Sequence, residues 1–152
     1  MKLTSPAFGE GATLPDRFAR ETDNRSPPLV IADVPREAKS VALIMDDPDA
    51  PSGTFTHWIV FNLDYNIGTL HENHVPRDAR LGRNDYGDLG YGGPRPPSGT
   101  HRYFFKLYAL DCRLDLPEGA SRADVDRAID NHIIDRAQLM GRYSAVPTDL
   151  TR

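Results

Sequence analysis

Three short runs of apolar and aromatic residues stand out along the chain and predict the centre of a β-sheet. Ser40–Met45 (SVALIM) is a continuous apolar run with polar residues on both sides, which is typical of a strand buried on both faces. His57–Leu63 and His101–Leu110 are rich in β-branched and aromatic residues, which favour a pleated, packed surface. We therefore expect these segments to be strands of one mostly antiparallel sheet.

A histidine opens each of the last two predicted strands. Because alternate side chains of a strand point to the same face, His57 should share a face with Ile59 and Phe61. By the same rule His101 should share a face with Tyr103. Both histidines are thus expected at strand ends, beside apolar neighbours.

A period of three to four residues predicts one helix over Ser121–Met140, with an apolar stripe facing the sheet. Ser121 can cap its N-terminus, Asp124 stands at the capping-box position, and Gly141 would end it. His132 falls on the stripe and is expected to be a core histidine with a hydrogen-bond partner. The elements together predict a mainly β (α+β) domain with a C-terminal helix packed on the sheet.

A segment rich in glycine and proline, Gly82–Gly99, separates the second and third predicted strands. Half of its residues are Gly or Pro, and no regular element is predicted in it. A long loop in a compact domain has an entropic cost that packing or ligand contacts must offset, so we interpret it as an ordered wall of a binding site. Arg95 in this loop is either a solvated side chain or an anion contact.

Length, charge and cysteine content exclude several classes of protein. With 152 residues and 39% hydrophobic residues, the chain is expected to form a single domain over residues 1–152. No stretch approaches the ~18 apolar residues that cross a bilayer, and no apolar signal core opens the chain, so a cytoplasmic protein without membrane insertion is expected. A net charge of -4 without a basic block argues against a nucleic-acid partner. Cys112, the single cysteine, is expected to be inert.

Residues capable of chemistry gather at the ends of the predicted strands. They are Asp46, Asp47, Asp49, His57, His101 and Tyr103. Pro48 and Pro51 restrict the acidic loop DDPDAP, and the Ala50–Pro51 bond is a candidate cis peptide. Imidazole and phenol groups, together with free backbone N–H groups such as those of Gly92–Gly93, can converge on an oxyanion. The pattern predicts a site for a phosphate or carboxylate, and a second carboxylate at the opening would suit a small zwitterion such as phosphoethanolamine.

Other interpretations of the same residues remain open. Each histidine can be a packed structural residue, and the acidic loop can be a solvated turn. A hydrolase could use a His and an Asp, but Ser98 has no evident base and no G-x-S-x-G elbow occurs. Two histidines and a carboxylate could also hold a metal, although no H-x-H or H-E-x-x-H spacing is present. We expect a protein without enzymatic activity, cofactor or metal.

Five motifs, taken in order, resemble the phosphatidylethanolamine-binding protein family, and most closely its prokaryotic, Raf-kinase-inhibitor-like branch. The motifs are SPPL (26–29), MDDPDAP (45–51), THW (56–58), GYGGPRPPSGTHRYFFKLYALD (90–111) and NHIIDRAQLMGRY (131–143). The resemblance covers the chain from about Ser26 to Tyr143. Eukaryotic members have a Trp where Phe55 stands here, so the aromatic character of that position is kept.

The resemblance implies a two-sheet, mainly antiparallel fold and a small pocket for phosphate-like anions. Carried over by position, the pocket would comprise Asp47, Asp49, His57, Pro96, His101 and Tyr103. Members of this family are regarded as binding or regulatory proteins. Some inhibit kinases or serine proteases, so a protein partner that is a kinase or a protease is an alternative, reached through the outer surface. Prokaryotic relatives are sometimes dimers, which makes a homodimer a further expectation.

Overall fold

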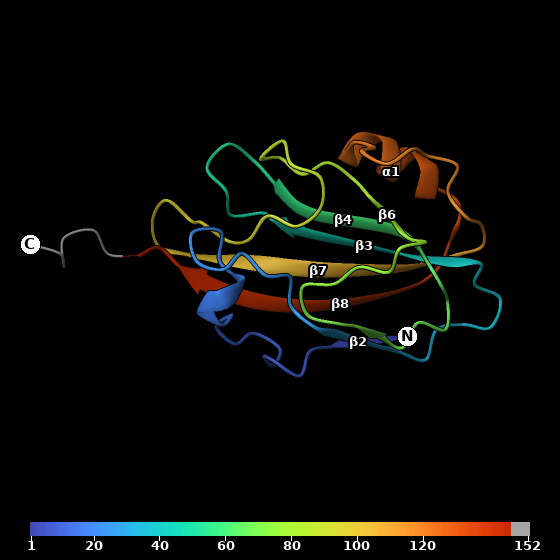
Figure 1. The fold of residues 1–152 in the computed structure, drawn as a ribbon, viewed down its shortest axis with the longest axis horizontal. Helices are drawn as coiled ribbons and strands as arrows, with labels where there is room; N and C mark the ends of the chain where they lie inside the picture. Colours follow the sequence, from blue (N-terminus) through green and yellow to red (C-terminus); the bar gives the residue numbers. More distant parts are fainter. Residues whose placement is uncertain (147–152) are drawn as a thin grey trace, which may run out of the picture.

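The computed structural model describes residues 1–146 and consists mainly of two antiparallel sheets (Figure 1). The larger sheet has five strands in the order β6-β4-β3-β7-β8. Its strands are β3 (Ser40–Asp47), β4 (Phe55–Leu63), β6 (Arg80–Leu81), β7 (Thr100–Leu110) and β8 (Ile133–Ser144). The smaller sheet has the order β1-β2-β5, with β1 (Lys2–Thr4), β2 (Leu29–Ala32) and β5 (Thr69–Leu70). A 3-10 turn, η1 (Asp16–Phe18), and one helix, α1 (Arg122–Ile129), complete the described elements.

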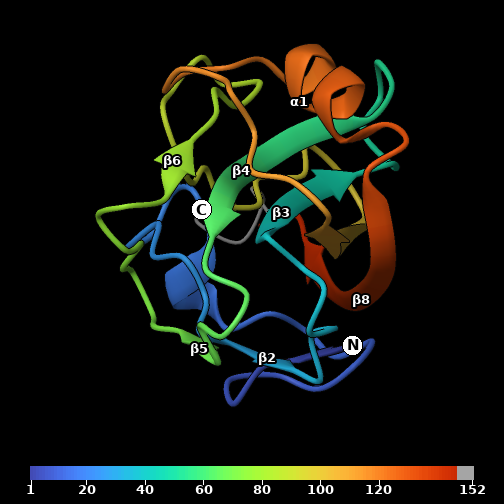
Figure 2. The same ribbon diagram turned by 90° about the vertical axis from the view of Figure 1, so that its right-hand side faces the viewer.

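The larger sheet is covered on both faces, which explains the continuous apolar run of β3. Seen end-on, the smaller sheet lies on one side of it and α1 on the other (Figure 2). All eight residues of β3 are buried, as the sequence predicts for Ser40–Met45. Alternate residues contribute to two cores, with Leu43 in the core under the smaller sheet and Ile44 in the core under α1.

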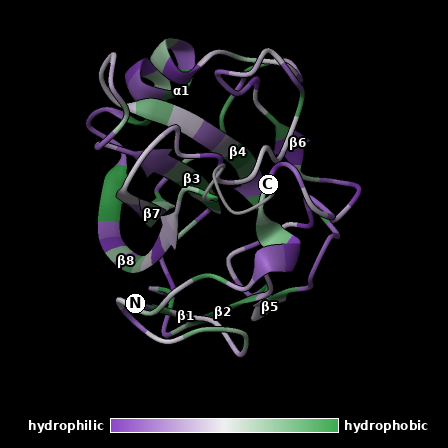
Figure 3. Ribbon diagram, turned by 90° about the vertical axis from the view of Figure 1, so that its left-hand side faces the viewer, coloured by the Kyte–Doolittle hydropathy of each residue, from purple (hydrophilic) through white to green (hydrophobic). Residues whose placement is uncertain are grey.

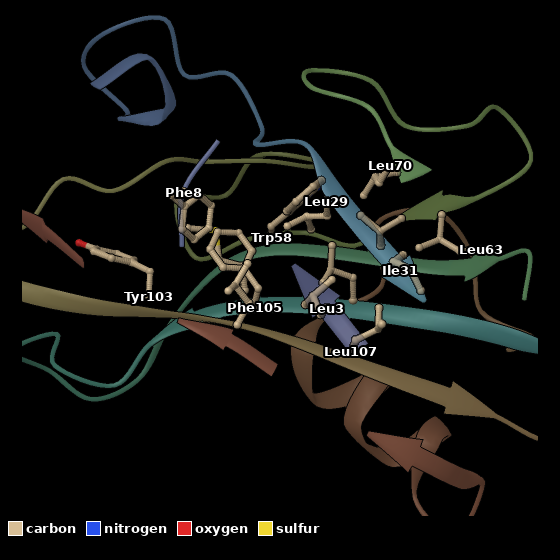
Figure 4. Close-up of a cluster of buried hydrophobic side chains, with 14 of the residues drawn as sticks. Leu3, Phe8, Leu29, Ile31, Trp58, Leu63, Leu70, Tyr103, Phe105 and Leu107 are labelled. Atoms are coloured by element: carbon tan, nitrogen blue, oxygen red, sulfur yellow. The ribbon is translucent and has the colours of Figure 1, made fainter. Parts of the chain in front are cut away.

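The main core lies between the two sheets. Leu3, Leu29 and Ile31 of the smaller sheet face Trp58, Phe105 and Leu107 of the larger one (Figure 4). The strands of the smaller sheet are largely hydrophobic in colour, whereas α1 alternates between hydrophobic and hydrophilic segments (Figure 3). The helix is therefore buried along one side only, through Val125 and Ile129.

The predicted helix over Ser121–Met140 is correct only in its first half. The Ser121 Oγ accepts a hydrogen bond from the Asp124 backbone N–H at 3.1 Å, so the predicted cap is present. The helix ends at Ile129, and Asn131, with a φ of 66°, reverses the chain into β8. The three-to-four spacing of apolar residues continues past this turn, but the pairing of β8 with β7 from Thr100 to Leu110 overrides it.

The extended conformation of β8 changes the surroundings of two residues that the helix would have placed. Gly141 lies inside β8, where a Cβ atom would meet the Leu14 side chain at 2.7 Å, and it does not end a helix. His132 lies just before β8 with its side chain 45% exposed, and its Nδ1 hydrogen bonds to Asp111 at 2.7 Å. The expectation of a core histidine was therefore wrong, although the expected hydrogen-bond partner is present.

β4 contains two β-bulges, and because of the one at His57 this residue does not share a face with Ile59 and Phe61 as predicted. Met45 pairs with Trp58 but Asp46 pairs with Thr56, which leaves His57 as an extra residue in β4. The second register shift lies between the pairs Val41–Leu63 and Leu43–Val60. A bulge changes the alternation of side chains and re-aims them. As a result, Ile59 and Phe61 face α1, whereas Trp58, Val60 and Leu63 face the smaller sheet. His57 lies on that second side, with its ring 5.2 Å from the ring of Tyr103.

Two smaller findings concern the backbone. No cis peptide bond occurs in residues 1–146, so the Ala50–Pro51 bond, a candidate for the cis form, is trans. Over the same residues, no helix has the length and the apolar character that crossing a bilayer requires.

Candidate ligand-binding cavity

A cavity of about 630 Å³ opens where β3 ends and where β4 and β7 begin. We call it the strand-end cavity. Its wall is formed by the turn after β3, the loop at 94–97 with Tyr86, the backbone at 19–22, and the end of β8 with residues 145–146. Of the six predicted site residues, five line it: Asp47, His57, Pro96, His101 and Tyr103. Segments far apart in the sequence therefore meet at one end of the larger sheet.

His101 and Asp47 form a buried pair in this wall. The His101 Nδ1 lies 2.6 Å from the Asp47 Oδ2, and the side chains are 9% and 4% exposed. Because an ionised carboxylate only accepts, Nδ1–H is the donor and the Nε2 atom is left without a partner among residues 1–146. The other Asp47 oxygen accepts from the Asp49 backbone N–H at 2.7 Å, which fixes the carboxylate. The His101 ring is therefore held in one orientation.

The His57 ring is held in a similar way, by a carbonyl instead of a carboxylate. Its Nδ1 lies 2.7 Å from the carbonyl oxygen of Gly92, so Nδ1 carries the proton. Burial lowers the pKa of His57, although the carbonyls of Gly92 and Gly93 and the charge of Asp47 oppose this effect. At neutral pH the ring is uncharged, and its Nε2 lone pair accepts hydrogen bonds until the ring gains a second proton.

Tyr103 presents a buried hydroxyl without a hydrogen-bond partner among the described residues. In Figure 4 this hydroxyl is directed away from the apolar side chains of the main core. Burial, followed by the charge of Asp47, raises the pKa of Tyr103 well above its usual value, so the group remains a donor. A buried polar group without a partner costs about 1–3 kcal/mol, which a polar group entering the cavity would recover.

Part of the Gly82–Gly99 segment forms a wall of the strand-end cavity, through Tyr86 and residues 94–97. The Asn84 side chain accepts from the backbone N–H groups of Tyr86 and Asp88, both at 3.0 Å, and closes the turn. The Tyr86 hydroxyl then donates to the carbonyl of Gly93 at 2.8 Å. A Cβ atom at Gly93 would lie 2.0 Å from the backbone oxygen of Phe18, so this close approach requires glycine.

Arg95 brings a positive charge to the cavity wall. Its guanidinium lies 5.4 Å from the centre of the Tyr86 ring, while that of Arg20 lies 3.9 Å from the same ring and is paired with Asp88 at 2.8 Å. In the described part of the chain, Arg95 has no carboxylate within 4.0 Å. Of the two arginines over Tyr86, Arg95 is thus the one with an uncompensated charge.

Two aspartates of the DDPDAP motif do not face the cavity. Asp46 points to the opposite side of β3 from Asp47, where its Oδ2 binds Lys106 at 3.0 Å and Arg122 at 3.1 Å. Asp49, predicted in the pocket, instead accepts from the guanidinium and the backbone N–H of Arg102 at 2.9 Å. The side-chain hydrogen bond from Arg102 lowers the pKa of Asp49 to about 2. The motif thus divides into one residue of the cavity wall, Asp47, and two residues that bind neighbouring side chains, Asp46 and Asp49.

Several parts of the wall carry no signal in the sequence. Tyr86, whose ring lies 4.7 Å from that of Phe55, could have been noticed as an aromatic residue in the glycine-rich loop. The backbone at 19–22 and 145–146 reaches the cavity through long-range hydrogen bonds, from Arg20 N–H to the Pro94 carbonyl and from Ala145 N–H to the Gly99 carbonyl. The sequences of these two segments do not predict that they contact the cavity.

A two-layered antiparallel β structure with a histidine-lined cavity at its strand ends defines the general class of this protein. Residues 4–144 match the phosphatidylethanolamine-binding protein family, and the chain belongs to this family. A UPF0098 protein of Methanothermobacter thermautotrophicus is 51% identical over 149 residues, which cover 94% of this chain and 98% of the relative. A UPF0098 protein of Chlamydia trachomatis is 44% identical over 148 residues, with 94% and 98% covered.

Solved structures have the same fold. A crystal structure described as a homolog of phosphatidylethanolamine-binding protein from Chlamydia trachomatis aligns with a TM-score of 0.91 at 43% identity, covering 95% of this chain and 97% of that one. Escherichia coli YbcL, described as a new member of the mammalian family, aligns with a TM-score of 0.90 at 30% identity, covering 95% and 98%. These matches establish the predicted family, prokaryotic branch and fold class.

Proposed function

We propose that this chain is a non-enzymatic binding protein whose strand-end cavity captures a small phosphate-like anion, of the phosphoethanolamine type. The observation that carries the proposal is the convergence of three side chains with uncommitted polar atoms. His57 and His101 both use Nδ1 within the protein, and Tyr103 has an unpartnered hydroxyl among the described residues. The Tyr103 hydroxyl can donate to an anion directly, and the Nε2 atoms of the two histidines can donate once their rings are protonated, which together is typical of an oxyanion site.

A positive charge on the cavity wall favours binding of an anion, and a bound anion in turn favours protonation of His57. Arg95 lines the strand-end cavity and supplies an uncompensated positive charge, which attracts an anion into the cavity. The pKa of His57 is lowered by burial, and a bound anion would oppose that effect by stabilising the imidazolium. Affinity for a ligand of fixed charge should therefore rise as the pH falls below neutral and His57 gains its second proton.

The remaining wall suits the organic part of such a ligand. Phe55, Pro51 and Val146 offer apolar surface beside the polar end of the cavity. Glu21, an exposed carboxylate of the wall, is placed to accept an ammonium group from a zwitterion. This combination favours phosphoethanolamine over a phosphate without an amine.

The absence of an activated nucleophile supports binding over hydrolysis. Within residues 1–146, the Nδ1 atoms of His57 and His101 are bound to a carbonyl and a carboxylate, and no Ser, Thr or Cys hydrogen bonds to either ring. In a hydrolase with such a pair, the Nε2 atom opposite the carboxylate activates a neighbouring serine, threonine or cysteine, and none hydrogen bonds to it among residues 1–146.

Calorimetric titration with phosphoethanolamine tests the proposal. His101→Gln should weaken binding about 10- to 100-fold, because a charge-assisted hydrogen bond contributes roughly 1.5–3 kcal/mol. Arg95→Gln should weaken it less and reduce its salt dependence. Asp49→Asn is the matched control, since Asp49 belongs to the same acidic loop but binds Arg102 outside the cavity. Equal affinities for wild type, His101→Gln and the control would refute the proposal.

A further inference from the structure

A second cluster of reactive side chains lies at the far end of the larger sheet. Asp111, Cys112 and His132 each offer one donor atom, and these atoms all lie within 4.8 Å of one another. In the described part of the chain, no other set of three Asp, Glu, Cys or His residues has this arrangement. The cluster combines a carboxylate oxygen, a thiol sulfur and an imidazole nitrogen.

The backbone around this cluster is fixed by hydrogen bonds. The Asp111 N–H donates to the carbonyl of His132 at 3.0 Å, which joins the two segments that carry the donors. The buried hydroxyl of Ser40 donates to the carbonyl of Cys112 at 2.6 Å. The His132 N–H donates to the Ile129 carbonyl at 2.9 Å, so the end of α1 also holds the histidine in place. The three side chains therefore project from a prearranged backbone.

We propose that Asp111, Cys112 and His132 form a zinc-binding site. A thiolate, an imidazole and a carboxylate are all ligands of Zn²⁺, and a softer sulfur donor disfavours Mg²⁺ and Ca²⁺. Three protein ligands leave the fourth tetrahedral position open to water or to another ligand. The divalent charge neutralises a thiolate and a carboxylate that are adjacent in the chain.

Small side-chain movements bring the donors to zinc distances. Bond lengths of about 2.0–2.3 Å to a tetrahedral ion place the ligand atoms about 3.3–3.8 Å apart. The Asp111–His132 pair, now 2.7 Å apart through a shared proton, must open by about 0.6 Å when the proton leaves. Both side chains are about half exposed, at 49% and 45%, so rotation is unobstructed by a core. Cys112 is partly buried at the margin of the core under α1.

This site is distinct from the strand-end cavity. His101 and Tyr103 stand at the start of β7, whereas Asp111 follows its last residue, Leu110. Ten residues of extended strand span about 33 Å, so the two sites occupy opposite ends of the sheet (Figure 1). Zinc binding can therefore be tested without disturbing the cavity, and the outcome is independent of the proposed function.

Cobalt and zinc titrations of the reduced protein test the proposal. Co²⁺ should bind with one equivalent and produce a thiolate-to-cobalt charge-transfer band, which Cys112→Ser should abolish. His132→Gln and Asp111→Asn should each weaken Zn²⁺ binding at least about tenfold, as expected for loss of a ligand. The double variant His71→Gln/His74→Gln, which removes two histidines outside the cluster, is the control for adventitious surface binding and should bind as wild type.

The variants must be shown to fold for a loss of metal to be meaningful. Unchanged thermal melting of metal-free Cys112→Ser confirms its fold, and Zn²⁺ should raise the melting temperature of wild type but not of this variant. Cobalt binding without a charge-transfer band would overturn the proposal. So would zinc affinity that survives Cys112→Ser and His132→Gln, or that disappears in the control.

Discussion

Replacing Gly93 with alanine should damage the strand-end cavity without removing any of its polar groups. The added Cβ would lie 2.0 Å from the carbonyl oxygen of Phe18 and 2.9 Å from the backbone N of Arg20. Both neighbours are backbone atoms, which cannot rotate away as a side chain can. The glycine-rich loop and the 18–20 segment must therefore separate, which strains the Arg20 N–H to Pro94 carbonyl hydrogen bond at 3.0 Å.

The size of the effect follows from the cost of overpacking. Forced insertion of a methyl group costs about 1–3 kcal/mol. For a chain of this length each kcal/mol lowers the melting temperature by about 2–4 °C, so Gly93→Ala should melt roughly 2–12 °C below wild type. Phosphoethanolamine affinity should fall as well, because Gly93 also accepts the hydrogen bond that positions Tyr86.

Thermal denaturation and calorimetry, carried out with a matched variant, check this prediction. A Cβ added at Gly9 would have no heavy atom within 4 Å, and Gly9 has no positive φ, so Gly9→Ala should leave the melting temperature nearly unchanged. A Gly93→Ala protein that melts within about one degree of wild type would show that the two segments are not in close contact. A drop of equal size in Gly9→Ala would show that the effect is not specific to the cavity wall.

Three further outcomes follow from single side chains. Arg122→Gln should lower the free energy of unfolding by about 2 kcal/mol in urea titrations, because the buried Asp46 then keeps only Lys106 as a cationic partner; a change below about 0.5 kcal/mol would contradict this. Tyr103→Phe should leave stability unchanged or slightly higher while weakening phosphoethanolamine binding, because the lost hydroxyl has no partner among residues 1–146; a clear loss of stability would reveal such a partner. The pKa of Asp49 falls to about 2 in the folded state from 3.8, so its stabilisation is complete above pH 4 and is lost as the pH falls towards 2. The stability advantage of wild type over Asp49→Asn should therefore shrink between pH 4 and pH 2, and an advantage independent of pH would refute the assignment.

The sequence correctly predicts those elements for which the local pattern of apolar residues and the packing in the folded protein favour the same secondary structure. β3, β4 and β7 follow from their apolar and aromatic runs, and the cap of α1 follows from Ser121. The strand at Ile133–Ser144 could not be predicted by periodicity, since its apolar residues fit a helical stripe as well. The segment becomes a strand because it pairs with the free edge of β7. That edge forms only when the larger sheet folds, so the local sequence does not reveal it.

Most of the residues that line the candidate site were predictable from the sequence, but their detailed geometry was not. His101 and Tyr103 lie on one face, as a period of two predicts. His57 reaches the same cavity for a different reason, because a bulge shifts its side chain away from the face of Ile59. Likewise, nothing in the DDPDAP motif itself reveals that Asp47 hydrogen bonds to His101 while Asp49 hydrogen bonds to Arg102.

The wall at residues 145–146 has a consequence for biosynthesis. This segment reaches the cavity through the Ala145 N–H bond to the Gly99 carbonyl, after β8 has paired with β7. During translation the ribosome delivers residues 145–146 after every other segment of that wall. A nascent chain can therefore assemble the shared interior of the two sheets before the cavity wall is complete, because the wall closes only once residues 145–146 have been made.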